Sequence, residues 1–274
     1  MNALPLLPYV VSAAAYVVYF ARRSEPAGRV ATVTLVLGAL THTFVLGMQT
    51  MQVGHIPFVG TTGAVSFFVC LLALAYLYTE MMTDERAMGV FIVPLMAVLQ
   101  LIPAATNSVA PRPEVLDSPW FVIHVSALLF AYASFALACV VGVTYELLFK
   151  ELKAKHLGFF YARLPSLQVL DVMNGRAVAV GWVFLTVGLV VGAVWLLQVQ
   201  QDTLDPRVQA MTLLDPKIFL VVVCWLVYSF ELYARRAIGW SGRRAALLSA
   251  AGFTVLLLNF VPLSYFVTGS HNFY

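Results

Sequence analysis

The sequence predicts an all-α integral membrane protein, a bundle of about eight transmembrane helices with both termini external. The first observation is composition: 61% of the 274 residues are hydrophobic and 11% are charged, whereas a soluble globular domain is about 25% charged. The second is that these hydrophobic residues gather in long runs, as a bilayer crossing of roughly 20 residues requires. Because unpaired backbone groups are not tolerated in lipid, the runs should be helices, and they are too long and too uniformly apolar for barrel strands.

The runs define eight expected helices in chain order. They cover residues 4–21, 30–50, 59–79, 87–104, 119–149, 177–199, 215–234 and 245–267. The first is followed, not preceded, by basic residues and lacks a small-residue cleavage site, so we expect a retained helix and no signal peptide. The fifth and seventh runs contain Glu146 and Glu231. Glu146 can snorkel to the near interface, and Glu231 can pair with Arg235 one turn later.

The third observation is the distribution of basic residues. Of the 16 lysines and arginines, only Arg112, Arg207 and Lys217 fall in one set of loops, and the other 13 fall in the opposite set. The positive-inside rule places the richer set in the cytoplasm, so both termini are predicted outside. We expect a multi-pass protein of the bacterial cytoplasmic (inner) membrane, with membrane lipid as a partner. The net charge of +3 follows from this orientation and indicates no nucleic-acid partner.

Several functional classes lack their sequence signatures. The three cysteines, Cys70, Cys139 and Cys224, lie in different apolar runs and form no C-x-x-C pair, so neither dithiol chemistry nor a cysteine zinc site is indicated. No P-loop, G-x-G-x-x-G or H-E-x-x-H motif occurs. No residue stands out as catalytic. Whether the chain is an enzyme stays open, with a non-catalytic role favoured.

Three of the five histidines are expected at the external face. His124 lies near the external end of the fifth run, His271 follows the eighth run, and His55 lies in the loop after the second. A lone imidazole can simply hydrogen-bond to a neighbouring helix. Two histidines converging from different helices can also be the axial ligands of a haem, and a third nitrogen from His55 would allow zinc. These alternatives stay open from the residues alone.

The haem interpretation predicts further contacts. Trp120 and Tyr265 lie in the sequence neighbourhood of His124 and His271, where aromatic rings can pack against the porphyrin. His42 lies near the middle of the second run, around ten residues or about 15 Å deeper than its external end. We therefore expect that His42 is not an axial ligand of an external haem, although a second, deeper haem is left open.

Several segments, in their order along the chain, resemble the cytochrome c assembly superfamily of haem-handling membrane proteins, which includes CcsA, CcmC and HemX types. The resemblance covers about residues 35–274, leaving the N-terminal helix, residues 1–22, outside the clearest match. We expect one polytopic membrane domain, residues 1–274. The segments that carry the resemblance are HT at 42–43, GHIP at 54–57, WFVIHVSALLFAYASFA at 120–136, residues 164–195, DPK at 215–217, WLVY at 225–228, residues 239–253 and GSHNFY at 269–274.

The resemblance implies a b-type haem, one or possibly two, held near the external face. It implies His124 and His271 as axial ligands, with His55 and His42 as further candidates. Within the matching segments it also implies haem-binding roles for three retained residues, Trp195, Asp215 and Trp225.

The chain also departs from the superfamily pattern. The stretch QQDTLDPRVQAMTLLDPKI has no tryptophan where CcsA and CcmC carry a tryptophan-rich motif, Ile218 replaces its acid, and Tyr233 stands where a family histidine is expected. We therefore expect a HemX-type haem-binding protein for haem handling, biogenesis or electron transfer, acting with other membrane or haem-biogenesis proteins. The alternatives are a cytochrome c synthase subunit that delivers haem to an apocytochrome, or a non-haem scaffold or regulator of haem synthesis.

Overall fold

The computed structural model describes residues 2–58, 60–106, 117–155, 158–202 and 216–260, and in these residues it is helical without strands. This confirms the predicted all-α membrane fold with eight helices. A π-helical turn, Ala234–Ile238, follows α8. The α-helices are α1 Leu6–Arg22, α2 Glu25–Val53, α3 Gly60–Thr83, α4 Gly89–Ala105, α5 Pro119–Lys153, α6 Leu167–Asp202, α8 Pro216–Tyr233 and α9 Arg243–Phe260.

Five of these helical segments are long and apolar enough to cross a membrane by themselves. They are Glu25–Val53, Gly60–Thr83, Pro119–Lys153, Leu167–Gln201 and Ile218–Ile238. Two further apolar helices, α1 and α4, have 17 residues each, or about 26 Å at 1.5 Å per residue. They are therefore close to the roughly 30 Å of a hydrocarbon core. The chain is a multi-pass membrane protein.

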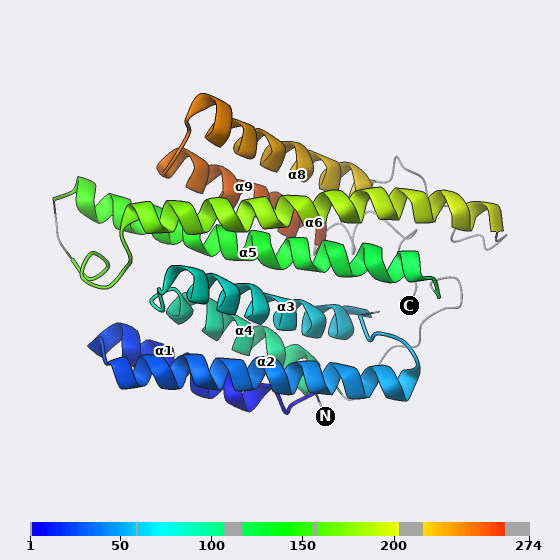
Figure 1. Cartoon of the computed structure of the whole chain (residues 1–274), viewed down its shortest axis with the longest axis horizontal. Helices are drawn as coiled ribbons and strands as arrows, with labels where there is room; N and C mark the ends of the chain where they lie inside the picture. The colour runs from blue at the N-terminus through cyan, green and yellow to red at the C-terminus, as the bar shows by residue number, and fades with distance from the viewer. Residues whose placement is uncertain (1, 59, 107–116, 156–157, 203–215, 261–274) are drawn as a thin grey trace.

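The helices form two halves that lie side by side (Figure 1). α1–α4 make the N-terminal half, and α5–α9 make the C-terminal half. The two halves meet chiefly where α3 packs against α5, while α3 barely touches α6. Within the C-terminal half, α5 and α6 form the most extensive helix pair in the described structure. This α5–α6 interface positions the candidate site described below.

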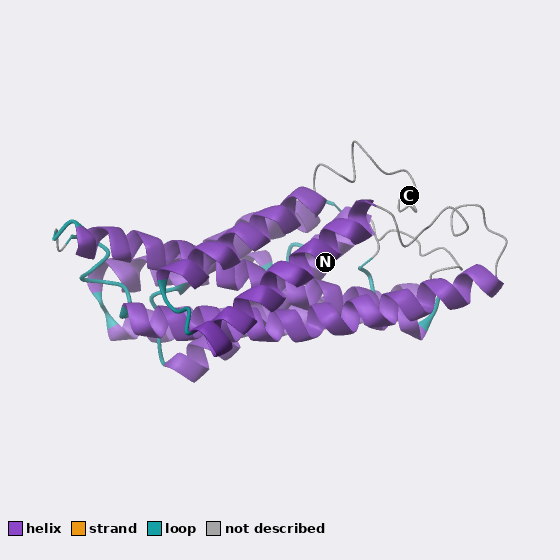
Figure 2. Ribbon diagram, turned by 90° about the horizontal axis from the view of Figure 1, so that it is seen from above, coloured by secondary structure: helices purple, strands orange, loops and turns teal. Residues whose placement is uncertain are grey.

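All helices run lengthwise along the molecule (Figures 1 and 2). The turns α1–α2, α3–α4, α5–α6 and α8–α9 gather at one end (Figure 1), and these are the connections expected to be cytoplasmic. The structure thus separates the two sets of loops onto opposite ends of the bundle. Which end faces the cytoplasm remains a prediction from the basic residues.

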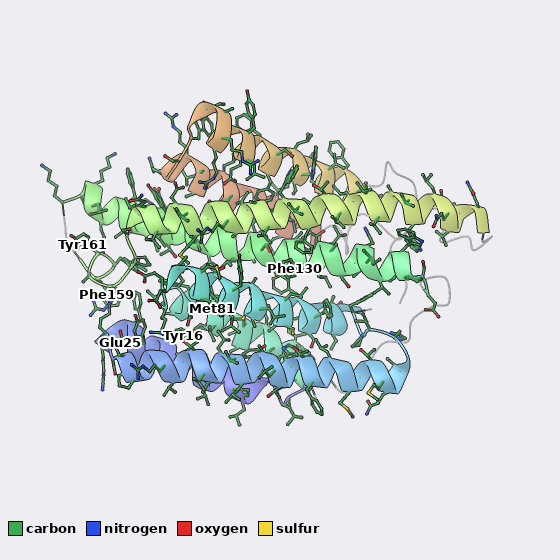
Figure 3. All side chains as sticks on the ribbon, in the orientation of Figure 1. Tyr16, Glu25, Met81, Phe130, Phe159 and Tyr161 are labelled. Atoms are coloured by element: carbon green, nitrogen blue, oxygen red, sulfur yellow. The ribbon has the colours of Figure 1, made fainter. Side chains whose placement is uncertain are left out.

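The N-terminal half contains a buried carboxylate near the expected cytoplasmic end. Glu80 on α3 accepts hydrogen bonds of 2.5 Å from the hydroxyls of Tyr16 and Thr32, and its Oε1 lies 3.7 Å from Nε of Arg86. Arg86 also pairs with Glu25 at 3.3 Å. Tyr16 and Glu25 are both seen at this end in Figure 3. These contacts explain how the net-acidic 80–86 connection can lie at the end that carries most basic residues.

The largest difference from the expected helices is the start of α6. The sequence predicts a connector over 150–176 and a span from residue 177, but α5 extends to Lys153 and α6 begins at Leu167. Polar residues of this segment account for the extension, because they have partners in the folded protein. Asp171 and Asn174 accept hydrogen bonds from Arg235, which follows α8, at 2.8 Å and 2.5 Å. Because these polar groups are satisfied by the C-terminal half, the segment packs as helix. The expected Glu231–Arg235 pair is also present, at 3.3 Å.

Candidate functional site

His124 lies on α5, five residues after the helix begins at Pro119, and its side chain is half-buried against α6. Its Nδ1 lies 2.7 Å from the carbonyl oxygen of Gly188. A carbonyl oxygen can only accept, so Nδ1 must carry the proton and donate it. In the neutral imidazole, the lone pair is then on Nε2. A carbonyl bond of this kind commonly orients metal-binding histidines, so His124 has its protonation and ring position set by the backbone of α6.

Two glycines of α6 allow this close approach. A Cβ added at Gly192 would lie 2.3 Å from Nδ1 and 2.4 Å from Cε1 of His124, and one added at Gly188 would lie 2.7 Å from Cδ2 of Leu128. Gly188 and Gly192 form a G-x-x-x-G spacing, which places both on one face of a helix and allows close helix contact in membranes. Neither glycine was predicted as a site residue, although their spacing can be read from the sequence.

Trp195 lies three residues after Gly192 and therefore near the same face of α6. Its side chain is buried, and its ring packs on Phe121 of α5 with the ring centroids 5.0 Å apart. Its indole Nε1–H is buried and has no hydrogen-bond acceptor among the residues that the structure describes. An unpaired buried donor is costly and calls for an explanation. The donor lies in the layer just outside His124, because Phe121 precedes His124 by three residues on α5.

Aromatic residues continue from this interface towards the N-terminal half. Phe58, in the connection after α2, is buried and packs on Phe121 with a ring distance of 6.0 Å. His55 lies in the same connection, half-buried, with Nδ1 3.1 Å from the carbonyl oxygen of Ile56. Trp120 is 45% exposed at the beginning of α5. The structure therefore places both His55 and Trp120 at the same end of the bundle as His124.

Trp225 occupies a different face. Its Nε1 donates to Thr186 at 2.8 Å, and its ring stacks on Trp182, whose Nε1 donates to Ser229. Thr186 and Gly188 are two residues apart, so at 100° per residue they point to nearly opposite sides of α6. Trp225 thus takes part in α6–α8 packing across α6 from His124, and both indole donors are satisfied there.

His42 is fully buried within the N-terminal half. Its Nδ1 lies 3.1 Å from the hydroxyl of Tyr9, and its Nε2 lies 2.9 Å from the hydroxyl of Ser66. Both ring nitrogens are therefore engaged by hydroxyls from α1 and α3. This arrangement is typical of a structural histidine, and whether His42 ligates a haem stays a prediction.

Three predicted site residues, Asp215, Tyr265 and His271, lie outside the described residues. The second axial position therefore stays a prediction from the sequence. Among residues that the structure does describe, no three His, Cys, Asp or Glu side chains are grouped so as to hold a metal ion. The described part of the site is accordingly His124, its glycine contacts on α6 and Trp195.

These residues fit one side of a haem site. An axial imidazole needs an unprotonated nitrogen and a fixed ring, and the Gly188 carbonyl provides both conditions for His124. The buried indole N–H of Trp195 is a donor suited to an anionic group such as a haem propionate. Phe121 and Trp195 supply an apolar aromatic surface beside it.

Comparison with known proteins now places the chain. The family model described as cytochrome C assembly protein matches residues 3–271. The chain belongs to the cytochrome c assembly protein family. Similar proteins include cytochrome c biogenesis protein CcsA of Guillardia theta, 25% identical over 258 residues, which are 87% of this chain and 83% of the relative. The CcsA of Prochlorococcus marinus (strain MIT 9303) is 27% identical over 275 residues, which are 89% of this chain and 84% of the relative.

These relatives bear on the expected subtype. They carry the name CcsA, and they support the alternative drawn from the sequence better than the HemX type. The family membership expected from the sequence is confirmed by the match over nearly the whole chain. The relatives include plastid and cyanobacterial proteins, so the particular membrane in which the chain resides stays a prediction.

Proposed function

We propose that this chain is a CcsA-type membrane subunit of cytochrome c biogenesis that binds haem near the external membrane face for delivery to an apocytochrome. The observation that carries the proposal is the 2.7 Å bond from Nδ1 of His124 to the Gly188 carbonyl, which fixes the tautomer and the orientation of the imidazole. Family membership and the names of the relatives support the same function.

The residues of the site have separate roles in this proposal. His124 would hold the iron, and the Gly188 carbonyl keeps a proton on Nδ1 and orients the imidazole. The indole N–H of Trp195 pairs with a propionate, and Phe121 excludes water from one porphyrin edge. Haem supplies the iron that His124 ligates and the vinyl carbons to which apocytochrome thiols are attached. We propose that His271, outside the described residues, would supply a second histidine ligand.

The chain's own thiols are unsuited to a part in that attachment. Cys70 and Cys224 are buried and Cys139 is partly buried, and all three are free. Each lies within a membrane helix, which keeps it from a water-soluble partner. The thiols that react would therefore come from the apocytochrome, and the role of this chain is to hold and present the haem.

A haem-custody role without transfer is the second candidate. The sequence observation that favours it is the lack of tryptophan in residues 200–218, where transfer subunits of this superfamily are expected to carry their tryptophan-rich docking surface. Trp195 at the end of α6 is the buried aromatic donor that the described site retains. The two candidates share the haem site and differ in whether haem leaves it for another protein.

One experiment tests the site and a second separates the candidates. The purified chain should show the absorption spectrum of a low-spin b-type haem in its oxidised and reduced forms. The His124→Ala and His271→Ala variants should each open one coordination position and lose haem, whereas the His156→Ala variant, altered on the expected cytoplasmic side, should not. An unchanged low-spin spectrum in both ligand variants would refute the site.

Co-expression with an apocytochrome c then tests delivery. Transfer predicts that covalent haem on the apocytochrome, detected by its peroxidase stain after denaturing electrophoresis, depends on His124 and on the presence of this chain. A chain that retains haem but yields no covalent cytochrome alongside the other biogenesis subunits would favour haem custody.

A further inference from the structure

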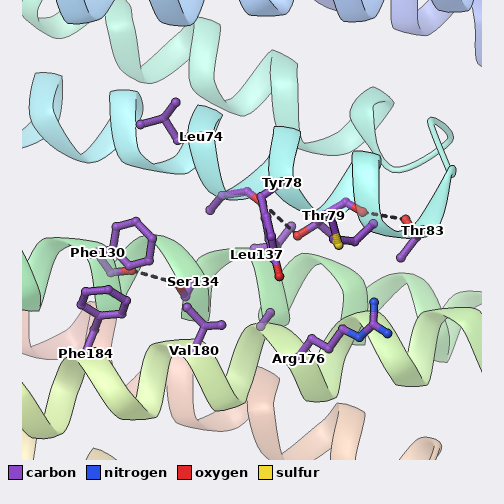
Figure 4. Close-up of a pocket in the computed structure, with 13 residues that line it drawn as sticks. Leu74, Tyr78, Thr79, Thr83, Phe130, Ser134, Leu137, Arg176, Val180 and Phe184 are labelled. Carbon is purple, nitrogen blue, oxygen red and sulfur yellow. Dashed lines mark hydrogen bonds between the residues drawn. The ribbon is translucent and has the colours of Figure 1, made fainter.

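A groove lies between the two halves of the molecule, on the side where α3 faces α5 and α6 (Figure 4). It has a volume of about 320 Å³ and a lining that is almost entirely apolar. Small-molecule pockets occupy roughly 300–1,000 Å³, so the groove is at the small end of that range. It is distinct from the His124 site, since its lining residues on α5 begin at Phe130 and continue towards the expected cytoplasmic end.

The inner part of the groove suits a hydrocarbon chain. Phe130 and Phe184 lie together at its membrane-buried end, with their ring centroids 4.2 Å apart, and Leu74 and Val180 line its sides (Figure 4). The hydroxyl of Ser134 donates to the Phe130 carbonyl of its own helix at 3.0 Å. Because this donor is used internally, the inner groove offers apolar contact and no spare hydrogen-bond donor from that hydroxyl.

The opposite end of the groove carries a cation. Arg176 of α6 is exposed and lines the groove level with Thr79 and Thr83, near the end of α3 (Figure 4). Both threonine hydroxyls donate their proton to a carbonyl of their own helix, at 2.8 Å each. Neither hydroxyl proton is therefore available to a bound molecule. The groove therefore has an apolar length and one positive end at the level where the expected cytoplasmic interface lies.

Arg176 differs from the arginines that stabilise the fold. Arg86, Arg235 and Arg243 each form an ion pair with a carboxylate, whereas no ion pair of Arg176 occurs within the described part of the chain. A guanidinium binds phosphate through paired N–H donors and does so better than an ammonium group. An unpaired guanidinium at the head of an apolar groove is complementary to an amphiphile with an anionic phosphate head.

We infer that this groove binds one anionic phospholipid of the cytoplasmic leaflet, with its phosphate at Arg176 and one acyl chain lying between α3 and the α5–α6 pair. The lipid fills the space where α3 diverges from α6 and so supports the contact between the halves, which otherwise depends chiefly on α3 and α5. The inference goes beyond the proposed haem function and uses the predicted orientation of the bundle.

The test measures lipid retention by the full-length purified chain with native mass spectrometry. The protein is exchanged into nanodiscs that contain phosphatidylcholine and phosphatidylglycerol with identical acyl chains, and the lipids kept after release are counted. The wild-type chain should retain one phosphatidylglycerol in preference to phosphatidylcholine. Since a basic residue near a membrane surface contributes about 1 kcal/mol towards anionic lipid, Arg176→Gln should reduce that preference by about fivefold.

Two matched controls make the test specific to the groove. Arg236→Gln removes another exposed arginine that does not line the groove, and it should leave retention unchanged. Val180→Trp fills the groove and should abolish retention of phosphatidylglycerol. Val183→Trp places the same bulk on a 50% exposed position of α6 outside the groove and should not.

The outcomes separate this inference from its competitors. Equal retention of both lipids by the wild type, or unchanged selectivity in Arg176→Gln, would show annular lipid only and overturn it. Loss of haem in Arg176→Gln with no change in lipid would assign the groove to haem and also overturn it. If Val180→Trp does not elute as a folded monodisperse protein, the comparison of Arg176→Gln with Arg236→Gln decides by itself.

Discussion

Gly192→Ala is the sharpest perturbation of the candidate haem site, because the added methyl group would be directed at the ring of His124. The new Cβ would lie 2.3 Å from Nδ1, 2.4 Å from Cε1 and 3.1 Å from Cγ of that ring. Real Cβ contacts of this kind are longer than about 3 Å, so either the ring or the helix must move. A moved ring loses the bond to the Gly188 carbonyl that fixes its protonation.

The effect on stability should be moderate, because a gain in helix propensity offsets part of two losses. Replacing glycine by alanine inside a helix is worth about 1 kcal/mol in propensity. Loss of the hydrogen bond costs about 0.5–1.5 kcal/mol, and overpacking typically costs about 1–3 kcal/mol. The net change should therefore be a destabilisation of about 0.5–3.5 kcal/mol, whereas displacement of a bond that orients a metal ligand typically reduces affinity by about 10–100-fold.

The assay is haem retention after purification, read from the absorption spectrum, with thermal unfolding measured in parallel. Gly181→Ala is the matched control, because its Cβ would lie 2.6 Å from Cε1 of Phe135 in the same α5–α6 interface without touching a histidine. We expect similar unfolding temperatures for the two variants and haem loss in Gly192→Ala alone. Equal haem retention in both, or equal loss in both, would refute the argument that the Gly192 contact positions a ligand.

Four further predictions follow from single contacts. Trp195→Phe keeps the aromatic contact but removes the buried donor, so haem affinity in a titration should fall at least about tenfold, as for loss of a bond to a charged group, with an unchanged low-spin spectrum. His42→Ala leaves its two hydroxyl partners unsatisfied and should lower the free energy of unfolding by about 1–3 kcal/mol without altering the external haem spectrum. Arg235→Met leaves two carboxylates uncompensated, that of Glu231 fully buried, and should destabilise the chain by about 3–5 kcal/mol in chemical unfolding. A reporter fused after Tyr274 should be active only as an external fusion; activity of a cytoplasmic-only reporter would invert the topology and move His124 to the other face.

The number and order of the helices could be predicted from the sequence because each depends on local composition. A run of apolar residues must be helical in lipid whatever it packs against, so the expected spans 59–79 and 119–149 differ only slightly from α3 and α5. The start of α6 could not be predicted in this way. Residues 167–176 include polar side chains that favour a surface segment, and they become part of a helix through Arg235, which lies about sixty residues later.

The candidate ligand His124 could be proposed from the sequence, but the residues that position it could not. His124 stood out because a histidine within an apolar run is rare and usually has a reason. Gly188 and Gly192 could have been noted from their spacing alone, but nothing local indicates that they face His124 across an antiparallel helix pair. The same is true of Trp225: its place in the family pattern suggested haem contact, whereas its actual partners, Thr186 and Trp182, depend on how α8 packs against α6.

The contrast between His42 and His124 shows what the structure adds to the sequence. Both imidazoles lie within membrane helices, and composition alone cannot rank them. His42 meets two hydroxyl groups, and a hydroxyl can either donate or accept, so either tautomer is accommodated and both nitrogens are used within the fold. His124 meets a backbone carbonyl that can only accept, so its proton is fixed on Nδ1 and a single tautomer is selected. We therefore expect His42 to stabilise the core, and we propose His124, with its tautomer set by the backbone, as the ligand.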